Sequence, residues 1–100
     1  MSDRTEYPLF LTVNGRKISR IVIDQHYKEK HSESITDAII LELVKELDGE
    51  IFPIEIERAD FQYFTAEPVF RNEAPYRLIL VLYVYDDYLG VVNAFRVDRR

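Results

Sequence analysis

The chain contains no cysteine. This absence excludes disulfide bonds, a thiolate nucleophile and any sulfur-ligated metal site, so stability must come from packing alone. Glycine and proline are scarce as well, with three and four residues, and most of them lie where one regular element would end and the next begin.

Long hydrophobic runs are also missing. The longest apolar stretch covers residues 78–85, far short of the roughly 20 residues that a membrane-spanning helix needs. The N-terminal residues are polar and mixed in charge, whereas a secretory signal has a basic stretch followed by an apolar one. These two features predict a cytoplasmic protein without a membrane partner.

The size and composition favour one folded unit. The chain has 100 residues, of which 47% are hydrophobic and 31% charged, a balance typical of globular domains. There is no internal repeat, low-complexity tract or Gly/Ser linker. We expect a single domain that spans residues 1–100.

The net charge is −5, and the acid is concentrated in the middle of the chain. Residues 35–60 alone carry a net charge of −6. Proteins that bind nucleic acid gain most of their affinity by neutralising phosphates, so the overall acidity disfavours RNA as a partner.

The N-terminal part predicts a β-hairpin. Residues 9–13 and 18–23 are strand-like and flank Asn14-Gly15, whose tolerance of positive φ angles suits a tight turn. Residues 24–33 then turn polar, with neither strand alternation nor a helical stripe. We expect a loop or short helical turns there.

A helix is predicted over residues 35–48. Apolar residues recur at helical spacing along this segment, and most of its charged residues fall on the other side. Ser34 stands where a helix cap would, and Gly49 follows the last turn. The segment should bury its apolar stripe against a sheet.

Three further strands are predicted at residues 61–70, 76–85 and 89–97, with a short edge strand in residues 50–60. Short connections make the three an antiparallel meander. The sequence thus predicts an α+β fold, with one main helix packed on a mostly antiparallel sheet and the order N-terminal hairpin, helix, three-stranded meander.

The strand at residues 76–85 is apolar on both faces. One face carries Tyr76, Leu78, Leu80, Leu82 and Val84, and the other carries Arg77, Ile79, Val81, Tyr83 and Tyr85. One helix covers only one face, so the second needs the hairpin, residues 50–60, a second copy of the chain or a ligand. A homodimer is the plainest of these answers.

Tyr83 and Tyr85 are candidate binding residues on that second face. Aromatic side chains that alternate with arginine on a sheet can stack nucleic-acid bases. Aromatic residues in strands more commonly pack against their neighbours, however, and we favour packing here.

Asn93 is a further binding candidate. In a regular strand it shares a face with Leu89, Val91, Phe95 and Val97, where it interrupts an apolar row. A buried amide without hydrogen bonds costs about 1–3 kcal/mol. Asn93 should therefore either fix a local backbone feature or face a site, and we favour the first.

His26 and His31 are the candidates for acid–base chemistry near neutral pH, because no other side chain here has an unperturbed pKa in that range. Their spacing of five does not place two ligands on one helical face, so we expect no metal site. The alternative is that both are solvated histidines on a polar connector.

Basic residues gather near the two ends of the chain: Arg16, Lys17, Arg20, Arg96, Arg99 and Arg100. If the hairpin and the last strand are neighbours, these residues form a basic edge that can hold a phosphate, with Arg20 as a binding residue. Most such clusters are merely solubilising surface.

The histidine-bearing segment that runs into a helix, and the meander that closes on Val91-Val92-Asn93-Ala94-Phe95-Arg96, resemble small bacterial and phage proteins of the barnase, colicin and RelE-like fold. The resemblance covers about residues 18–97, in element order more than in motif. It implies a metal-independent ribonuclease, often the toxin of a toxin–antitoxin pair. His26 and His31 match its histidine-bearing segment, and Arg96 matches the position that closes the last strand.

Three functional hypotheses remain. The first is a non-enzymatic domain on a RelE/barnase-like scaffold that acts through protein contacts, above all as a homodimer. The second is a ribonuclease in which His26 or His31 is the general base or acid, and Arg96 and a tyrosine stabilise the phosphate. The third is an acidic inhibitor, an antitoxin or immunity protein, whose residues 35–60 bind a basic partner. We expect no cofactor in any of them.

Overall fold

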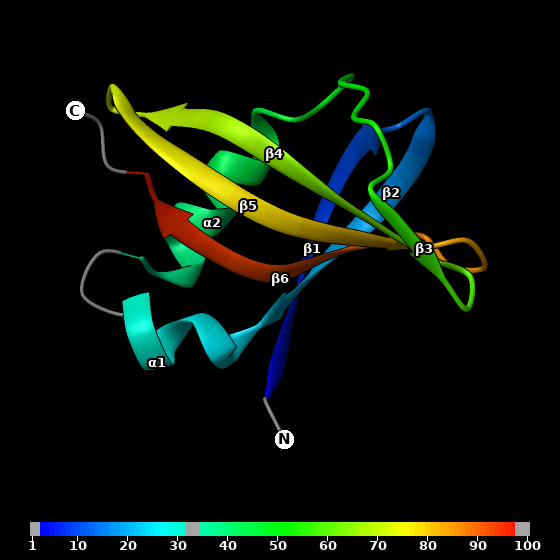
Figure 1. Ribbon diagram of the computed structural model, residues 1–100, viewed down its shortest axis with the longest axis horizontal. Coiled ribbons are helices and arrows are strands. Elements are labelled where there is room, and N and C mark those ends of the chain that lie inside the picture. The colour runs from blue at the N-terminus through cyan, green and yellow to red at the C-terminus, as the bar shows by residue number, and fades with distance from the viewer. Residues whose placement is uncertain (1–2, 32–34, 98–100) are drawn as a thin grey trace.

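Six strands form one twisted sheet in the computed structural model, which describes residues 3–31 and 35–97 (Figure 1). The strands lie in the order β1-β2-β6-β5-β4-β3. Their bounds are Arg4–Val13 (β1), Arg16–Asp24 (β2), Ile56–Arg58 (β3), Phe61–Arg71 (β4), Ala74–Tyr83 (β5) and Tyr88–Arg96 (β6). Two short helical turns, η1 (Gln25–Tyr27) and α1 (Lys28–His31), follow β2, and α2 spans Asp37–Lys45.

This architecture contradicts the predicted α+β fold of a helix on a mostly antiparallel sheet built from a hairpin and a separate meander. The described chain is mostly strand, and the hairpin and the meander belong to one mixed sheet because β2 pairs with β6 in parallel. This pairing aligns Arg20 with Tyr88 and Ile23 with Val91. Alternating side chains specify which face of a strand is buried, but not which strand lies beside it.

The N-terminal hairpin itself is confirmed. β1 and β2 pair antiparallel on either side of Asn14 (φ 53°) and Gly15 (φ 73°), and two successive positive φ angles give a turn that matches the strand twist. The side-chain oxygen of Asn14 also accepts the N–H of Phe52 at 2.6 Å. The turn therefore holds the chain segment that leads to β3.

The amphipathic helix is present but shorter than the predicted residues 35–48. Thr36 caps its start, because its side-chain oxygen accepts the N–H of Ile39 at 3.2 Å. Ser34, the predicted cap, lies outside the described residues. The regular helix ends at Lys45. Within residues 3–31 and 35–97, no helix is long and apolar enough to cross a membrane.

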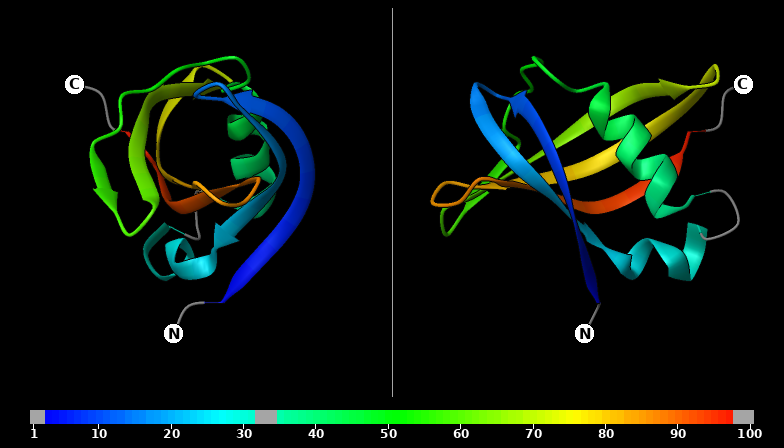
Figure 2. Two further views of the ribbon diagram at one scale, coloured as in Figure 1. Left: turned by 90° about the vertical axis from the view of Figure 1, so that its right-hand side faces the viewer. Right: turned by 180° about the vertical axis from the view of Figure 1, so that it is seen from behind.

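One continuous apolar core lies between α2 and the sheet (Figure 2). Its most buried members, all at most 2% exposed, include Ile40, Leu43 and Val44 of α2, Ile21 and Ile23 of β2, and Leu78, Leu80 and Leu82 of β5. The apolar stripe of the helix thus packs on the Leu80 and Leu82 side of the sheet, as predicted. We call this side of the sheet the inner face and the opposite side the outer face.

A β-bulge in β6 overturns the predicted position of Asn93. The pairing with β5 shifts between Ile79 and Leu80, so that Ile79 lies opposite Asn93 and Leu80 lies opposite Val91, which leaves Val92 as the extra residue. Because cross-strand partners share a face, Asn93 lies on the outer face and does not interrupt the core row. Its side-chain oxygen accepts the next backbone N–H at 2.9 Å, so it fixes a local backbone feature.

Candidate functional site

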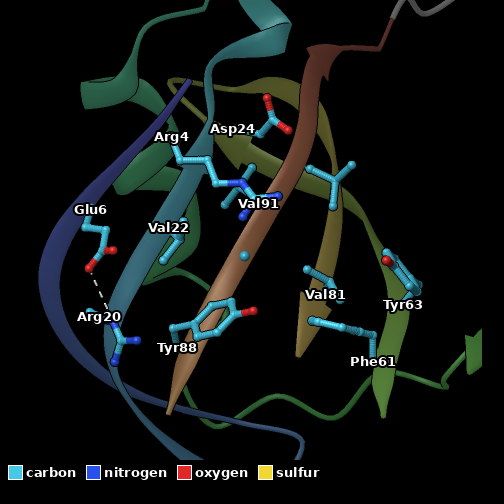
Figure 3. Close-up of a pocket in the computed structure, with 12 residues that line it drawn as sticks. Arg4, Glu6, Arg20, Val22, Asp24, Phe61, Tyr63, Val81, Tyr88 and Val91 are labelled. Carbon is cyan, nitrogen blue, oxygen red and sulfur yellow. Dashed lines mark ion pairs between the residues drawn. The ribbon is translucent and has the colours of Figure 1, made fainter. Parts of the chain in front are cut away.

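The outer face of the sheet holds a pocket of about 520 Å³ (Figure 3). In the figure, β1 and β2 form one side, β4 and β5 form the other, and β6 runs between them. The volume falls in the range of roughly 300–1,000 Å³ that is usual for ligand sites. The pocket is lined by Arg4, Glu6, Arg20, Val22, Asp24, Phe61, Tyr63, Val81, Tyr88, Gly90, Val91 and Val92.

Gly90 keeps the middle of the pocket open. A Cβ atom added at this position would lie 2.7 Å from Cγ1 of Val81 on the neighbouring strand, which is closer than two carbon atoms can pack. Tyr88 precedes Gly90 by two residues and so lies on the same face. The missing side chain therefore leaves a hollow bordered by Tyr88 and Val81.

Arg20 lies on the charged side of the pocket and is fully engaged. Its guanidinium forms ion pairs with Glu6 (3.3 Å), Asp86 (3.0 Å) and Asp87 (2.8 Å), and its Cζ lies 5.3 Å from the ring centre of Tyr88. The hydrogen bond between Arg20 and Asp86 lowers the pKa of Asp86 and raises that of Arg20. This predicted binding residue therefore ties β2 to the β5–β6 turn.

Arg4 lies on the same side but is not engaged. Its side chain reaches across β2 toward β6 (Figure 3), and it forms no hydrogen bond or ion pair with any residue in the described part of the chain. The acid beside it in the sheet register, Asp24, instead accepts the backbone N–H of His26 at 2.9 Å. Arg4 is thus a cation available to a ligand.

Aromatic and apolar side chains form the opposite side. Phe61 and Tyr63 of β4 border the pocket beside Val81 of β5 (Figure 3). Phe61 is held in place by Tyr83, whose ring stacks on it with centres 4.7 Å apart. Tyr85 packs edge-on against Tyr83 at 5.7 Å and is itself 74% exposed. The predicted binding residues Tyr83 and Tyr85 therefore support the wall without lining the pocket.

Two tyrosine hydroxyls at the pocket are unengaged. Neither Tyr63 nor Tyr88 forms a side-chain hydrogen bond with another residue among those described. Burial raises the pKa of Tyr88, although the charge of Arg4 acts in the opposite direction. The phenol of Tyr88 therefore remains protonated at neutral pH. Both hydroxyls can donate a hydrogen bond to a ligand.

The predicted catalytic residues His26 and Arg96 are not linked to each other by a hydrogen bond or ion pair in the described part of the chain, although η1 contacts β6. His26 lies in η1 with a 48% exposed side chain and its Nδ1 atom 3.6 Å from Glu29, and it forms no hydrogen bond or ion pair with Asn93 or Arg96 in the described chain. Arg96 is exposed at the end of β6, roughly 26 Å along the strand from Tyr88 at about 3.3 Å per residue. The side chain of His31 lies outside the described residues.

Two arginines of the predicted basic edge, Arg16 and Arg20, are engaged within the protein. β2 and β6 are neighbours, as that prediction required. Arg16, however, donates to the carbonyl oxygens of Val84 and Asp86, and Arg20 is neutralised by carboxylates. Arg99 and Arg100 lie outside the described residues. Within the described ranges, no three His, Asp or Glu side chains gather into a group that could hold a metal ion.

A second polar cluster surrounds Asp37, the first residue of α2. Tyr7 donates to its carboxylate at 2.6 Å, Tyr27 at 2.5 Å and Gln25 at 3.2 Å. Burial alone would raise the pKa of Asp37, but these hydrogen bonds outweigh it, and the pKa is lowered. The cluster joins β1, η1 and α2 and leaves Asp37 with no free oxygen for chemistry, so we assign it a structural role.

Sequence reasoning missed most of the residues that line the pocket, above all Arg4, Tyr63 and Tyr88. The alternation of β4 places Phe61 and Tyr63 on one face, which was a usable signal. No sequence signal pointed to Arg4, because this residue reaches the pocket only through the parallel pairing of β2 and β6.

No protein-family model, no curated protein and no solved structure matches this chain. The resemblance to the barnase, colicin and RelE-like fold therefore stays a prediction. The function of the pocket has to be inferred from its own geometry and charge.

Proposed function

We propose that this chain is a non-catalytic domain that acts in the cytoplasm through protein contacts and binds a segment of a partner chain in the outer-face pocket. The observation that carries the proposal is that the pocket combines a half-exposed aromatic wall with Arg4, a cation that has no hydrogen-bond or ion-pair partner in the described part of the chain. Both lie on the face that α2 does not cover. Aromatic residues and arginine dominate the energetics of protein interfaces. The partner is another protein or a second copy of this chain.

Selection from a random peptide library tests the proposal. We expect the wild-type domain to enrich peptides whose binding shifts the backbone amide signals of β2, β4 and β6 in NMR spectra. A Val92→Arg variant, which fills the pocket from its border, should lose these peptides while its spectrum still shows a folded domain. Peptides that bind this variant equally well, or that shift only signals elsewhere, would contradict the proposal.

A second candidate, the acidic inhibitor, is favoured by the segment around β3. Its exposed side chains combine isoleucines with acids: Ile51, Ile54, Ile56, Glu50, Glu55, Glu57 and Asp60. Such a surface suits a basic partner. Photo-crosslinkers are placed at position 54, in the segment around β3, or at position 92, at the pocket, in cells that produce the protein. The position that captures a partner shows which of the two surfaces binds it. A partner captured only from position 54 would favour the inhibitor.

The ribonuclease hypothesis has less support, because neither His26 nor Arg96 lines the outer-face pocket. An assay of RNA cleavage at neutral pH, with and without ribosomes, tests it directly. Cleavage by the wild type that is lost in a His26→Ala/His31→Ala variant would overturn the non-catalytic proposal.

A further inference from the structure

We propose that the pocket binds the C-terminal residue of a polypeptide, with Arg4 holding its terminal carboxylate and the aromatic wall holding its apolar side chain. This inference rests on the proposed function and names the chemical group that the pocket recognises. It is carried by the position of Arg4, which has no hydrogen-bond or ion-pair partner among the described residues, across the pocket from an apolar wall.

Arg4 is the cation of the pocket that could bind an anion. Of the two arginines that line it, Arg20 is already neutralised by Glu6, Asp86 and Asp87, whereas Arg4 has no hydrogen-bond or ion-pair partner among the described residues. A guanidinium binds a carboxylate through two parallel hydrogen bonds. Arg4 can therefore bind one carboxylate.

The same charges disfavour a polyanion. Glu6 and Asp24 also line the pocket, and the acids Asp86 and Asp87 lie just beyond it on Arg20. A nucleic acid would bring several phosphates toward these carboxylates, in a chain whose net charge is already −5. A ligand with a single negative group avoids that repulsion.

The apolar wall decides which carboxylate fits. Phe61, Tyr63 and Val81 face the charged side across β6 (Figure 3), so the ligand needs an apolar group close to its carboxylate. An internal Asp or Glu carries its carboxylate on a polar side chain and offers no such group. A C-terminal Phe or Leu carries both groups on one Cα atom. The unengaged hydroxyl of Tyr88, near Arg4, supplies a further donor to the carboxylate.

The test uses two short peptides, N-acetyl-Gly-Gly-Phe with a free C-terminal carboxylate and the same peptide as the C-terminal amide. Each is titrated into the full chain while backbone amide signals are followed by NMR. We expect the acid to shift signals of β2, β4 and β6 and to bind at least about tenfold more tightly than the amide, because a hydrogen-bonded charge is replaced by a neutral group.

An Arg4→Gln variant should bind the acid as weakly as the amide. Its matched control is Arg58→Gln on β3, an exposed arginine outside the pocket, which should behave as the wild type.

Equal binding of acid and amide, or binding of the acid that Arg4→Gln leaves unchanged, would overturn the inference while the proposed function stands. Failure of both peptides to bind would also overturn it, and the library selection then judges the proposed function separately. If a single-stranded RNA oligonucleotide shifts the same signals more strongly, the inference is wrong and the group that the pocket binds is a phosphate.

Discussion

The two faces of the sheet differ in how completely their groups are satisfied. On the inner face, Leu78, Leu80 and Leu82 of β5 are fully buried against α2 and its neighbours. On the outer face, the same strand presents Val81 to a pocket in which Arg4 has no hydrogen-bond or ion-pair partner in the described chain. Because side chains alternate along a strand, one β-strand can serve stability on one face and binding on the other.

The largest expected effect of a substitution is on the inner face. Leu80→Ala should lower the free energy of unfolding by about 2–5 kcal/mol, because it removes a fully buried side chain and leaves a cavity. Val92→Ala, at the border of the outer-face pocket, should change it by about 0.5 kcal/mol or less. Urea denaturation of both variants measures the difference. If both variants lose a similar amount of unfolding free energy, the two faces do not differ in their contribution to stability.

The next effect concerns the hollow at Gly90. Gly90→Ala should cost about 1–3 kcal/mol, because the new methyl group would meet the stiff side chain of Val81. A Val81→Ala substitution in the same chain should recover part of this loss by removing the clashing atom. If thermal unfolding shows no recovery in the double variant, the hollow does not depend on the spacing between β5 and β6.

The next substitution removes hydrogen bonds that the Asp37 carboxylate accepts from Tyr7 and Tyr27. Asp37→Asn should lower the free energy of unfolding by roughly 1–2 kcal/mol. Asparagine has only one acceptor oxygen, so its amide group would meet the hydroxyl of either Tyr7 or Tyr27. Urea denaturation at neutral pH measures this loss. The conservative Tyr7→Phe change, which removes one donor, should cost less.

The Asp37 carboxylate should also make the free energy of unfolding depend on pH. The pKa of Asp37 is lowered in the folded chain, so the folded state binds its proton less readily than the unfolded state does. The stabilisation by Asp37 is therefore complete above the unfolded pKa, about pH 4, and is lost as pH falls through the lower folded pKa. The difference in unfolding free energy between wild type and Asp37→Asn should shrink below about pH 4. A difference that stays constant there would contradict the role of the hydrogen bonds.

The smallest effect should follow from Arg20→Gln. The three ion pairs of Arg20 are solvent-accessible, so global stability should change little. Local opening of the β5–β6 turn should become easier, because Asp86 and Asp87 lose their common partner. Amide hydrogen exchange should therefore speed up around residues 84–88 and not in β4. Unchanged exchange in the turn would show that Arg20 does not hold it.

The sequence allowed the local elements to be predicted better than their assembly. Asn14-Gly15 specified the first turn through positive φ angles, and the apolar spacing around Leu43 identified the helix. The parallel contact between β2 and β6 joins residues about 70 positions apart, such as Arg20 and Tyr88. It left no local pattern, and the fold class was wrong for that reason.

The candidate site was harder still to predict. His26 and Arg96 stood out by residue type, but neither lines the outer-face pocket. Asn93 was assigned to the wrong face because one extra residue, Val92, reverses the alternation beyond it. Tyr88 lay just outside the last predicted strand, which was expected to begin at residue 89, whereas β6 begins at Tyr88 and places this side chain at the pocket.

The most direct test of the central claim, that the outer face binds a partner segment, is the affinity of a library-selected peptide for an Arg4→Gln/Tyr63→Ala variant. We predict that this variant keeps the thermal midpoint of the wild type and loses the peptide. Undiminished peptide binding by a folded variant would contradict the claim.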